Sequence, residues 1–302
     1  MTQEHLHFRP QGFLLAGDAL DLPTRLASIA SWDGRPFDLV YLDPPFNVGS
    51  AFAVRRKTAR PAFDDAWGGL DAFLDMLAPR LAVLRDAMAE QATLWLHLDH
   101  RAVHDAKVRA DRIFGRAAFR GEIVWMPGNG ARGRGVPSTH QTILVYSRDA
   151  SPRGAYTWNE KDPALREPYA TTSLSMHFTS QSDDGRRFRE RTIAGKTYRY
   201  YADEGRKRGS VWSDVPAMLA NTPLRRETTG YPTQKPLALL ERIVLAASRP
   251  GDLVVDPMCG SGTTLEAAAR LERRFVGNDV GAEAIGIAKE RLARAGVTVV
   301  TE

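Results

Sequence analysis

Residues Val254 to Thr264, with the sequence VVDPMCGSGTT, decide the fold of this chain. A β-branched pair leads to Asp256, a loop with two glycines follows, and Thr263 opens an apolar helical stretch. This order predicts a strand, a tight turn and a helix N-terminus. Glycines let a ligand approach the backbone closely, and free N–H groups at a helix start attract negative or polar groups. The stretch therefore predicts a site for a nucleotide-like ligand.

The kind of ligand follows from what surrounds the loop. A strand expected from Arg274 to Asp279 ends in a carboxylate nineteen residues after Gly260, about where dinucleotide-binding units place their ribose-binding acid. No lysine follows Gly262, as a P-loop requires, and Leu265 replaces the third glycine of the dinucleotide fingerprint. A nucleoside ligand without a pyrophosphate fits better, and S-adenosylmethionine is the common one.

Length and composition restrict the class of protein. With 302 residues, 43% of them hydrophobic, the chain can form one α/β domain plus an inserted segment. Its net charge of +5 favours a polyanionic partner. The single Cys259 excludes an internal disulfide and a cysteine-based zinc cluster, and His100 and His104 lack a third ligand, so no metal is expected. Without a long apolar run or a signal-peptide pattern, a soluble, intracellular protein with no membrane contact is expected.

A second site is predicted where the buried strand Phe37 to Leu42 runs into the sequence DPPFN. Consecutive prolines at Pro44 and Pro45 forbid both a strand ladder and a helix, so the chain must leave the sheet there. Asp43 and Phe46 are then displayed at the sheet edge. The alternative is a proline-rich turn with a capping aspartate, but a fixed carboxylate beside an aromatic ring favours a reactive site.

The rest of the chain alternates strands with helices, which predicts a doubly wound, mostly parallel α/β sheet. The strand at 12–16 would deliver Asp18 just past its end, and the helix at 70–88 is interpreted as core packing alone. Further strands are expected at 92–98, 121–126 and 141–147, the last two as an antiparallel pair, and further helices at 237–248 and 282–295.

Basic residues gather in three places and are candidate DNA contacts. Residues 48–69 are interpreted as a loop with Arg55 and Arg56, and the loop PGNGARGRG carries Arg132 and Arg134. Residues 181–210 contain nine Lys or Arg against five acids, interleaved with aromatic rings, and include Arg186 and Arg187. A solvated basic surface is the alternative. The segment 151–228 is therefore predicted to recognise the target, and residues 1–150 with 229–302 to form the catalytic domain.

Three motifs in this order, DPPFN, YPTQKPLALLERIV and VVDPMCGSGTT, resemble the amino-methylating DNA methyltransferases of the permuted class. The resemblance runs from about Gly12 to about Leu292, and only 151–210 lacks a recognisable pattern. It implies a Rossmann-like S-adenosylmethionine-dependent fold of the seven-stranded type. It also implies duplex DNA as partner and a cytoplasmic, nucleoid-associated protein. A homodimer and a cognate restriction enzyme are left open.

The resemblance assigns roles to individual residues. Asp18 matches the acid near the cofactor adenine, Lys235 the lysine near the methionine carboxylate, and Asp279 the acid that holds the ribose hydroxyls. The catalytic tetrad would be Asp43, Pro44, Pro45 and Phe46, and the cofactor loop would be Asp256, Gly260, Ser261, Gly262 and Thr263. Phe46 departs from the commoner tyrosine and keeps the ring that would stack on a flipped base.

The predicted target is the N6 amine of adenine, because this chain has Asp43 at its catalytic motif. Enzymes that methylate N4 of cytosine more often have serine at the matching position. N4-cytosine methylation remains the alternative, and a regulatory protein that binds cofactor and DNA without turnover is a remoter one. Methylation of cytosine C5 requires a cysteine preceded by proline. Met258 precedes Cys259 in this chain, which excludes that reaction.

Overall fold

The computed structural model describes residues 12–45, 51–54, 60–64, 68–128, 135–150, 155–218 and 227–301. The chain divides into two compact units. The larger unit comprises Met1–Trp158 and Ser210–Glu302, and the smaller unit, here called the insert, comprises Asn159–Gly209. The insert lies inside the predicted segment 151–228. The described residues next to it, such as 210–218, belong to the larger unit.

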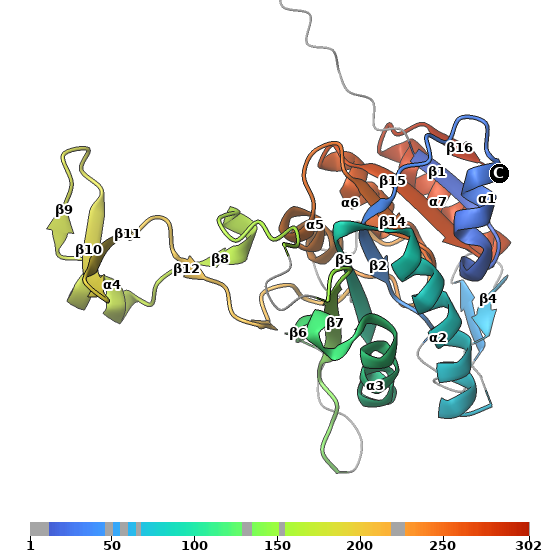
Figure 1. The fold of residues 1–302 in the computed structure, drawn as a ribbon, viewed down its shortest axis with the longest axis horizontal. Coiled ribbons are helices and arrows are strands. Elements are labelled where there is room, and N and C mark those ends of the chain that lie inside the picture. The colour runs from blue at the N-terminus through green and yellow to red at the C-terminus, as the bar shows by residue number, and fades with distance from the viewer. Residues whose placement is uncertain are drawn as a thin grey trace, which may run out of the picture. The chain divides into compact units, whose positions relative to one another are not determined.

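The larger unit is built on a nine-stranded sheet with the order β13-β6-β7-β5-β2-β14-β15-β1-β16 (Figure 1). In chain order its strands are β1 (Gly12–Ala16), β2 (Phe37–Leu42), β5 (Met88–Leu98), β6 (Phe119–Trp125), β7 (Gln141–Ser147), β13 (Val211–Trp212), β14 (Leu253–Asp256), β15 (Arg274–Asp279) and β16 (Val299–Thr301). Only β7 runs antiparallel to its neighbours β5 and β6, and every other pairing is parallel. The predicted doubly wound, mostly parallel sheet is confirmed.

Helices cover both faces of the sheet, as Figure 1 shows. They are α1 (Leu22–Ser28), α2 (Leu70–Ala87), α3 (Val103–Phe114), α5 (Leu237–Ala247), α6 (Thr263–Arg270) and α7 (Ala282–Arg294). Because side chains alternate along a strand, Phe13 and Leu15 join the core under α1 and α2, whereas Leu14 between them is buried outside that core. The sheet is therefore the middle of three layers, with helices on either side. The carboxyl ends of its parallel strands lie at one edge.

The expected loop at 48–69 contains an antiparallel pair, β3 (Ala51–Val54) with β4 (Arg60–Asp64). Phe52 and Val54 supply β propensity that the interpretation as a loop had overlooked. No helix among the described residues is long and apolar enough to span a bilayer.

The insert has its own short elements, which the sequence pattern did not predict. They are β8 (Arg166–Glu167), α4 (Thr171–His177), β9 (Ser180–Gln181), β10 (Arg187–Ile193), β11 (Lys196–Tyr201) and β12 (Arg206–Lys207). Strands β10 and β11 form an antiparallel hairpin that β9 extends, and β12 pairs with β8.

Candidate active site

The carboxyl ends of four neighbouring parallel strands, β2, β14, β15 and β1, meet at one edge of the sheet. There they deliver Asp43, Asp256, Asp279 and Asp18, and all four residues line a single cavity. Ligands of doubly wound sheets bind at this edge, outside the strand ends. Of the other predicted site residues, Pro44, Pro45, Lys235, Gly260, Ser261 and Thr263 also line the cavity.

The glycine loop connects β14 to α6 and is shaped by two left-handed glycines. Gly260 has φ 49° and Gly262 has φ 74°, a region that side chains disfavour. A Cβ on Gly260 would lie 3.0 Å from the Cε1 atom of Tyr231, which lines the cavity. A Cβ on Gly262 would lie 2.9 Å from the Cβ of Ala288 in α7, and Gly262 is not among the lining residues. Gly262 therefore allows the loop to pack against α7.

Asp279 ties the loop to the next strand. Its Oδ2 accepts the Gly260 N–H at 2.9 Å, and its Oδ1 accepts the Gly281 N–H at 2.8 Å. Burial raises the pKa of this carboxyl, while the two backbone donors oppose the shift. Each carboxylate oxygen can accept a further hydrogen bond, so Asp279 retains the capacity to bind a pair of hydroxyl groups.

Asp256 is buried at the end of β14. Burial raises its pKa to about 7; a hydrogen bond from Thr264 opposes the shift, and the negative charge of Asp43 adds to it. The carboxyl is thus close to half-protonated near neutral pH. A cation in the cavity would favour its ionised form.

Asp43 forms an ion pair with Lys235 at the rim of the same cavity. The Nζ of Lys235 lies 2.5 Å from Oδ2 of Asp43, and the lysine side chain is only 7% exposed. Pro44 and Pro45 follow as predicted and line the cavity, whereas Phe46 lies outside the described residues. Behind Asp43, the Tyr41 hydroxyl lies 2.7 Å from Nδ1 of His97. Both rings are fully buried, and burial lowers the pKa of His97 so that it remains neutral.

Asp18 is held by Arg80, a residue that the sequence analysis missed. The guanidinium Nε lies 2.8 Å from Oδ1, and Nη2 contacts Oδ2, which gives a two-point ion pair. Arg80 and Met76 both come from α2 and line the cavity. The interpretation of this helix as core packing alone was therefore incomplete. Arg80 is one of five charged residues of α2, so nothing in the sequence pattern distinguishes it.

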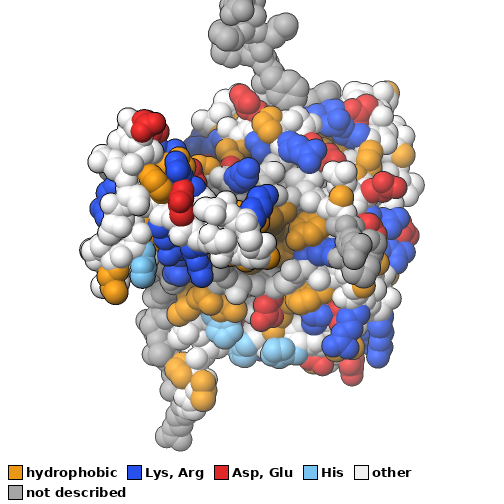
Figure 2. Space-filling view, turned by 60° about the vertical axis from the view of Figure 1, so that its left-hand side comes forward, with side chains coloured by type: hydrophobic (Ala, Val, Ile, Leu, Met, Phe, Trp, Pro, Cys, Tyr) orange, Lys and Arg blue, Asp and Glu red, His pale blue; other side chains and the backbone are white. Residues whose placement is uncertain are grey.

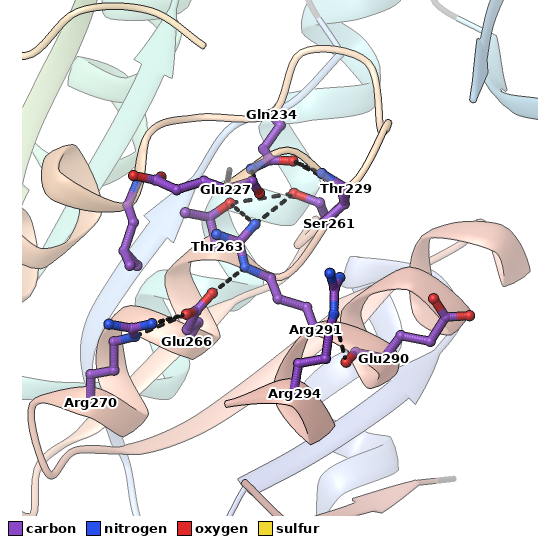
Figure 3. A network of polar contacts seen from close by, with 11 residues as sticks. Glu227, Thr229, Gln234, Ser261, Thr263, Glu266, Arg270, Glu290, Arg291 and Arg294 are labelled. Carbon is purple, nitrogen blue, oxygen red and sulfur yellow. Dashed lines mark hydrogen bonds and ion pairs between the residues drawn. The ribbon is translucent and has the colours of Figure 1, made fainter. Parts of the chain in front are cut away.

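A buried charge network supports the loop from behind (Figure 3). Arg291 of α7 is 4% exposed, donates to Thr263 Oγ1 at 2.8 Å and to Ser261 Oγ at 3.5 Å, and contacts the Glu266 carboxylate. Arg270 donates to the same carboxylate at 2.9 Å. Both hydroxyl groups therefore face α7, while the two residues also line the cavity. The sequence gives no local signal for this contact, since Arg291 follows the loop by some thirty residues.

The arginines predicted to contact DNA fall into two groups. Arg55, Arg56, Arg132 and Arg134 are outside the described residues. Arg186 and Arg187 belong to the insert, where Arg186 pairs with Asp203 and Glu204, and Arg187 donates to backbone carbonyl groups. In the described part of the chain, no group of three or more His, Cys, Asp or Glu residues could hold a metal ion.

The surface is mixed in charge on the face drawn in Figure 2. Lys and Arg side chains alternate there with Asp and Glu side chains, and hydrophobic side chains line a hollow. Long-range attraction to a polyanion depends on net charge and on local groups of unpaired cations, and cations held in ion pairs, such as Lys235 and Arg186, add little to it.

A doubly wound sheet whose strand ends present acids and a glycine loop to one cavity defines an α/β enzyme fold of the nucleoside-cofactor-binding kind. Residues 37–290 match the N6/N4 family described as DNA methylases. Because this match covers most of the sequence, the chain belongs to that family.

Two curated relatives have similar sequences. One is the type II methyltransferase M.EcaI of Enterobacter cloacae, 27% identical over 89% of this chain and 66% of the relative. The chain thus spans just under two thirds of that protein. The other is the DNA adenine methyltransferase YhdJ of Escherichia coli, 27% identical over 92% of this chain and 82% of the relative.

Solved structures share the fold at lower identity. A DNA modification methylase of Thermus thermophilus, described as putative and crystallised with S-adenosyl-L-methionine, has a TM-score of 0.54 at 22% identity and covers 96% of this chain and 97% of its own. The cytosine-N4-specific PvuII DNA methyltransferase has a TM-score of 0.57 at 15% identity and covers 94% and 89%. The two support the fold alone.

Proposed function

We propose that the protein transfers a methyl group from S-adenosylmethionine to the exocyclic N6 of an adenine flipped out of duplex DNA. The observation that carries the proposal is that Asp43, Pro44 and the glycine loop line one cavity. Family membership supports amino-methylation of DNA, and the name of the YhdJ relative is consistent with adenine. The aspartate at position 43 favours adenine over cytosine.

The residues of the cavity fit this cofactor. S-adenosylmethionine carries a sulfonium and an ammonium charge against one carboxylate, and the cavity wall has carboxyl groups in excess, from Asp18, Asp43, Asp256 and Asp279. Lys235 and Arg80 are the cations of the wall and suit a carboxylate. Pro44, Met76, Leu240 and Met258 supply apolar surface for the adenine ring. As the motif resemblance implies, Asp279 would accept from the ribose hydroxyls.

The chemistry depends on positioning. An exocyclic amine is a poor nucleophile because its lone pair is delocalised into the base. Asp43 carboxylate and the Pro44 carbonyl oxygen would accept its two N–H bonds and direct the lone pair at the methyl carbon. When bound, S-adenosylmethionine supplies an electrophilic methyl group. An N–CH₃ bond forms as the S–CH₃ bond breaks, and the amine proton leaves through Asp43 to solvent.

Analysis of nucleosides after incubation of duplex DNA with the protein and radiolabelled S-adenosylmethionine tests the proposal. We expect label in N6-methyladenine, and loss of at least a hundredfold in rate for Asp43→Ala, of the order seen when a transition-state hydrogen-bond partner is removed. Label in N4-methylcytosine alone would mean that the target base is cytosine, which is the specificity of the PvuII enzyme. Cofactor binding to wild type without any methylated product would support the regulatory alternative.

Partners and location follow as further proposals. Duplex DNA would be recognised by the segment 151–228, and the enzyme would act on DNA in the cytoplasm. A homodimer and a cognate restriction enzyme remain predictions from the resemblance, testable by light scattering and by cleavage of unmethylated DNA in cell extracts.

A further inference from the structure

The two faces of the β10–β11 hairpin in the insert differ in how far their charges are satisfied. Directly opposed residues of an antiparallel pair lie on one face, and the next pair along lies on the other. Arg191 opposes Tyr198 and Ile193 opposes Lys196 on the first face, here called the tip face. Glu190 opposes Arg199 and Thr192 opposes Thr197 on the second face.

The second face is satisfied within the hairpin. Arg199 donates to Glu190 Oε1 from Nε at 3.0 Å and from Nη2 at 2.9 Å. Its guanidinium also lies 4.0 Å from the centre of the Phe188 ring. The hydroxyl groups of Thr192 and Thr197 are 3.0 Å apart and hydrogen-bonded. This face presents no net charge at the end of the hairpin.

The tip face presents two cations without a counter-charge. Arg191 and Lys196 are exposed, and neither forms an ion pair with a carboxylate among the described residues. Tyr198 is 40% exposed and Ile193 is 50% exposed beside them. The Lys196 ammonium lies 5.4 Å from the Tyr198 ring centre, which keeps the ring and the charge together.

Nearer its base, the arginines of the same face contact other groups of the insert. Arg187 donates to the carbonyl oxygens of Phe178 at 3.0 Å and Leu174 at 2.6 Å. The Arg189 guanidinium lies 5.3 Å from the Tyr169 ring centre and 5.1 Å from that of Phe178. Of the arginines on this face, Arg191 alone projects beyond the packed part. At the end of the hairpin, the tip face therefore carries two exposed positive charges, those of Arg191 and Lys196.

The turn makes the end of the hairpin narrow. Ala194 at φ 47° and Gly195 at φ 77° form its two central residues, the combination that matches the twist of a two-stranded ribbon. Left-handed backbone costs an alanine about 1 kcal/mol. A two-stranded ribbon of this kind fits the major groove of B-form DNA.

We propose that the tip face enters the major groove of duplex DNA, with Arg191 and Lys196 against phosphates on the groove walls and Tyr198 and Ile193 against base edges. The proposal rests on the proposed function, because it takes duplex DNA as the partner. It assigns DNA contact to a face that excludes Arg186, whose guanidinium is paired with Asp203 and Glu204.

Binding of random-sequence duplex oligonucleotides, measured by fluorescence anisotropy over a range of NaCl concentrations, tests it. For Arg191→Gln with Lys196→Gln we expect roughly 10- to 100-fold weaker binding near 0.1 M salt, and a slope of log Kd against log salt smaller by about 2. Tyr198→Ala should weaken binding without changing that slope, because it removes no phosphate contact.

Two control variants separate face from charge. Glu190→Gln with Arg199→Gln alters the second face at constant net charge, and Lys161→Gln with Lys289→Gln removes two exposed cations elsewhere. Both should retain the wild-type Kd and slope. If Lys161→Gln with Lys289→Gln weakens DNA binding as much as the tip-face variant does, the effect is one of net charge and the proposal is overturned.

A wild-type slope for Arg191→Gln with Lys196→Gln would also overturn it. If wild type methylates DNA in that case, the proposed function stands and only the tip face is wrongly assigned. If wild type neither binds nor methylates DNA, the proposed function itself fails. Binding of S-adenosylmethionine, unaltered in every hairpin variant, verifies that the larger unit is folded.

Discussion

Lys235 and Asp43 form a buried ion pair with Nζ 2.5 Å from Oδ2, although 192 positions separate them in the chain. The pair joins two of the three motifs that suggested the family, because Asp43 directly follows β2 and Lys235 precedes α5. It also orients the carboxylate that would accept the amine hydrogen. Lys235 and Asp43 can pair because the fold brings both to the same edge of the sheet.

Lys235→Met tests this pair. Removal of one partner leaves the other charge buried, at a cost of about 3–5 kcal/mol, unless Asp43 takes up a proton. We expect a lower free energy of unfolding by urea denaturation at pH 8. The double variant Lys235→Met with Asp43→Asn should recover much of this loss while remaining inactive. Strictly additive losses would show that the two side chains do not interact.

The sequence was sufficient to predict several strand ends, because an acid stands at the end of β1, β2, β7 and β15 or within two residues after it. β1, β2, β7 and β15 have the bounds expected. It could not predict which side chains reach back to the cavity from other elements. Arg80 lies on a helix whose pattern indicates core, and Arg291 meets the loop only because α7 packs against Gly262.

Amino-acid composition was a weaker guide to the protein surface that contacts DNA. Counting charges predicted Arg186 and Arg187 as contacts, but a count cannot show which arginines already have partners. Arg186 pairs with acids seventeen and eighteen residues away along the chain. Within the hairpin, the register of β10 with β11 shows which cations have a carboxylate partner and which do not.

Asp256 should make stability and cofactor binding depend on pH. Its pKa rises from 3.8 in the unfolded chain to about 7 in the folded protein, so folding favours the protonated form. This contribution is complete below pH 4 and is lost as pH rises to 7, a decrease of about 4 kcal/mol in the free energy of unfolding. Asp256→Asn should remove that decrease in denaturation measured from pH 5 to pH 8.

Cofactor binding should show the opposite dependence. A cationic ligand favours ionised Asp256, so affinity for S-adenosylmethionine should increase as pH rises from 6 to 8 and protons should be released on binding. Isothermal titration in buffers of different ionisation enthalpy measures that release. Wild type and Asp256→Asn with the same pH dependence would assign the effect to another group, such as Asp279.

Gly262→Ala should destabilise the larger unit. The added Cβ would meet Ala288 at 2.9 Å and would hold an alanine at φ 74°. Backbone strain alone costs about 1–2 kcal/mol, and overpacking adds about 1–3 kcal/mol. Gly286→Ala is the matched control in α7, since nothing lies within 4 Å of its added Cβ. It should stabilise the helix by about 0.5–1 kcal/mol.

A second substitution separates the two causes in Gly262→Ala. Adding Ala288→Gly removes the Ala288 Cβ at 2.9 Å but leaves its Cα at 3.2 Å and the strained backbone, so part of the stability should return relative to Ala288→Gly alone, as measured by thermal unfolding. Full recovery would mean that the left-handed conformation costs nothing. No recovery would mean that Ala288 is not the obstacle.

Arg291→Met should loosen the glycine loop without touching the cavity. The guanidinium holds Thr263 at 2.8 Å and contacts Glu266, so its loss leaves a buried carboxylate with Arg270 as its remaining partner. We expect S-adenosylmethionine to bind roughly tenfold more weakly, equivalent to about 1.4 kcal/mol. Arg294→Met, one turn further along α7 and bonded only to the backbone of Glu290 among described residues, is the matched control.

If both variants bind the cofactor like wild type, the network stabilises the fold but does not position the loop. If Glu266→Gln restores stability to Arg291→Met yet not its affinity, the arginine acts on the loop through the two hydroxyl groups.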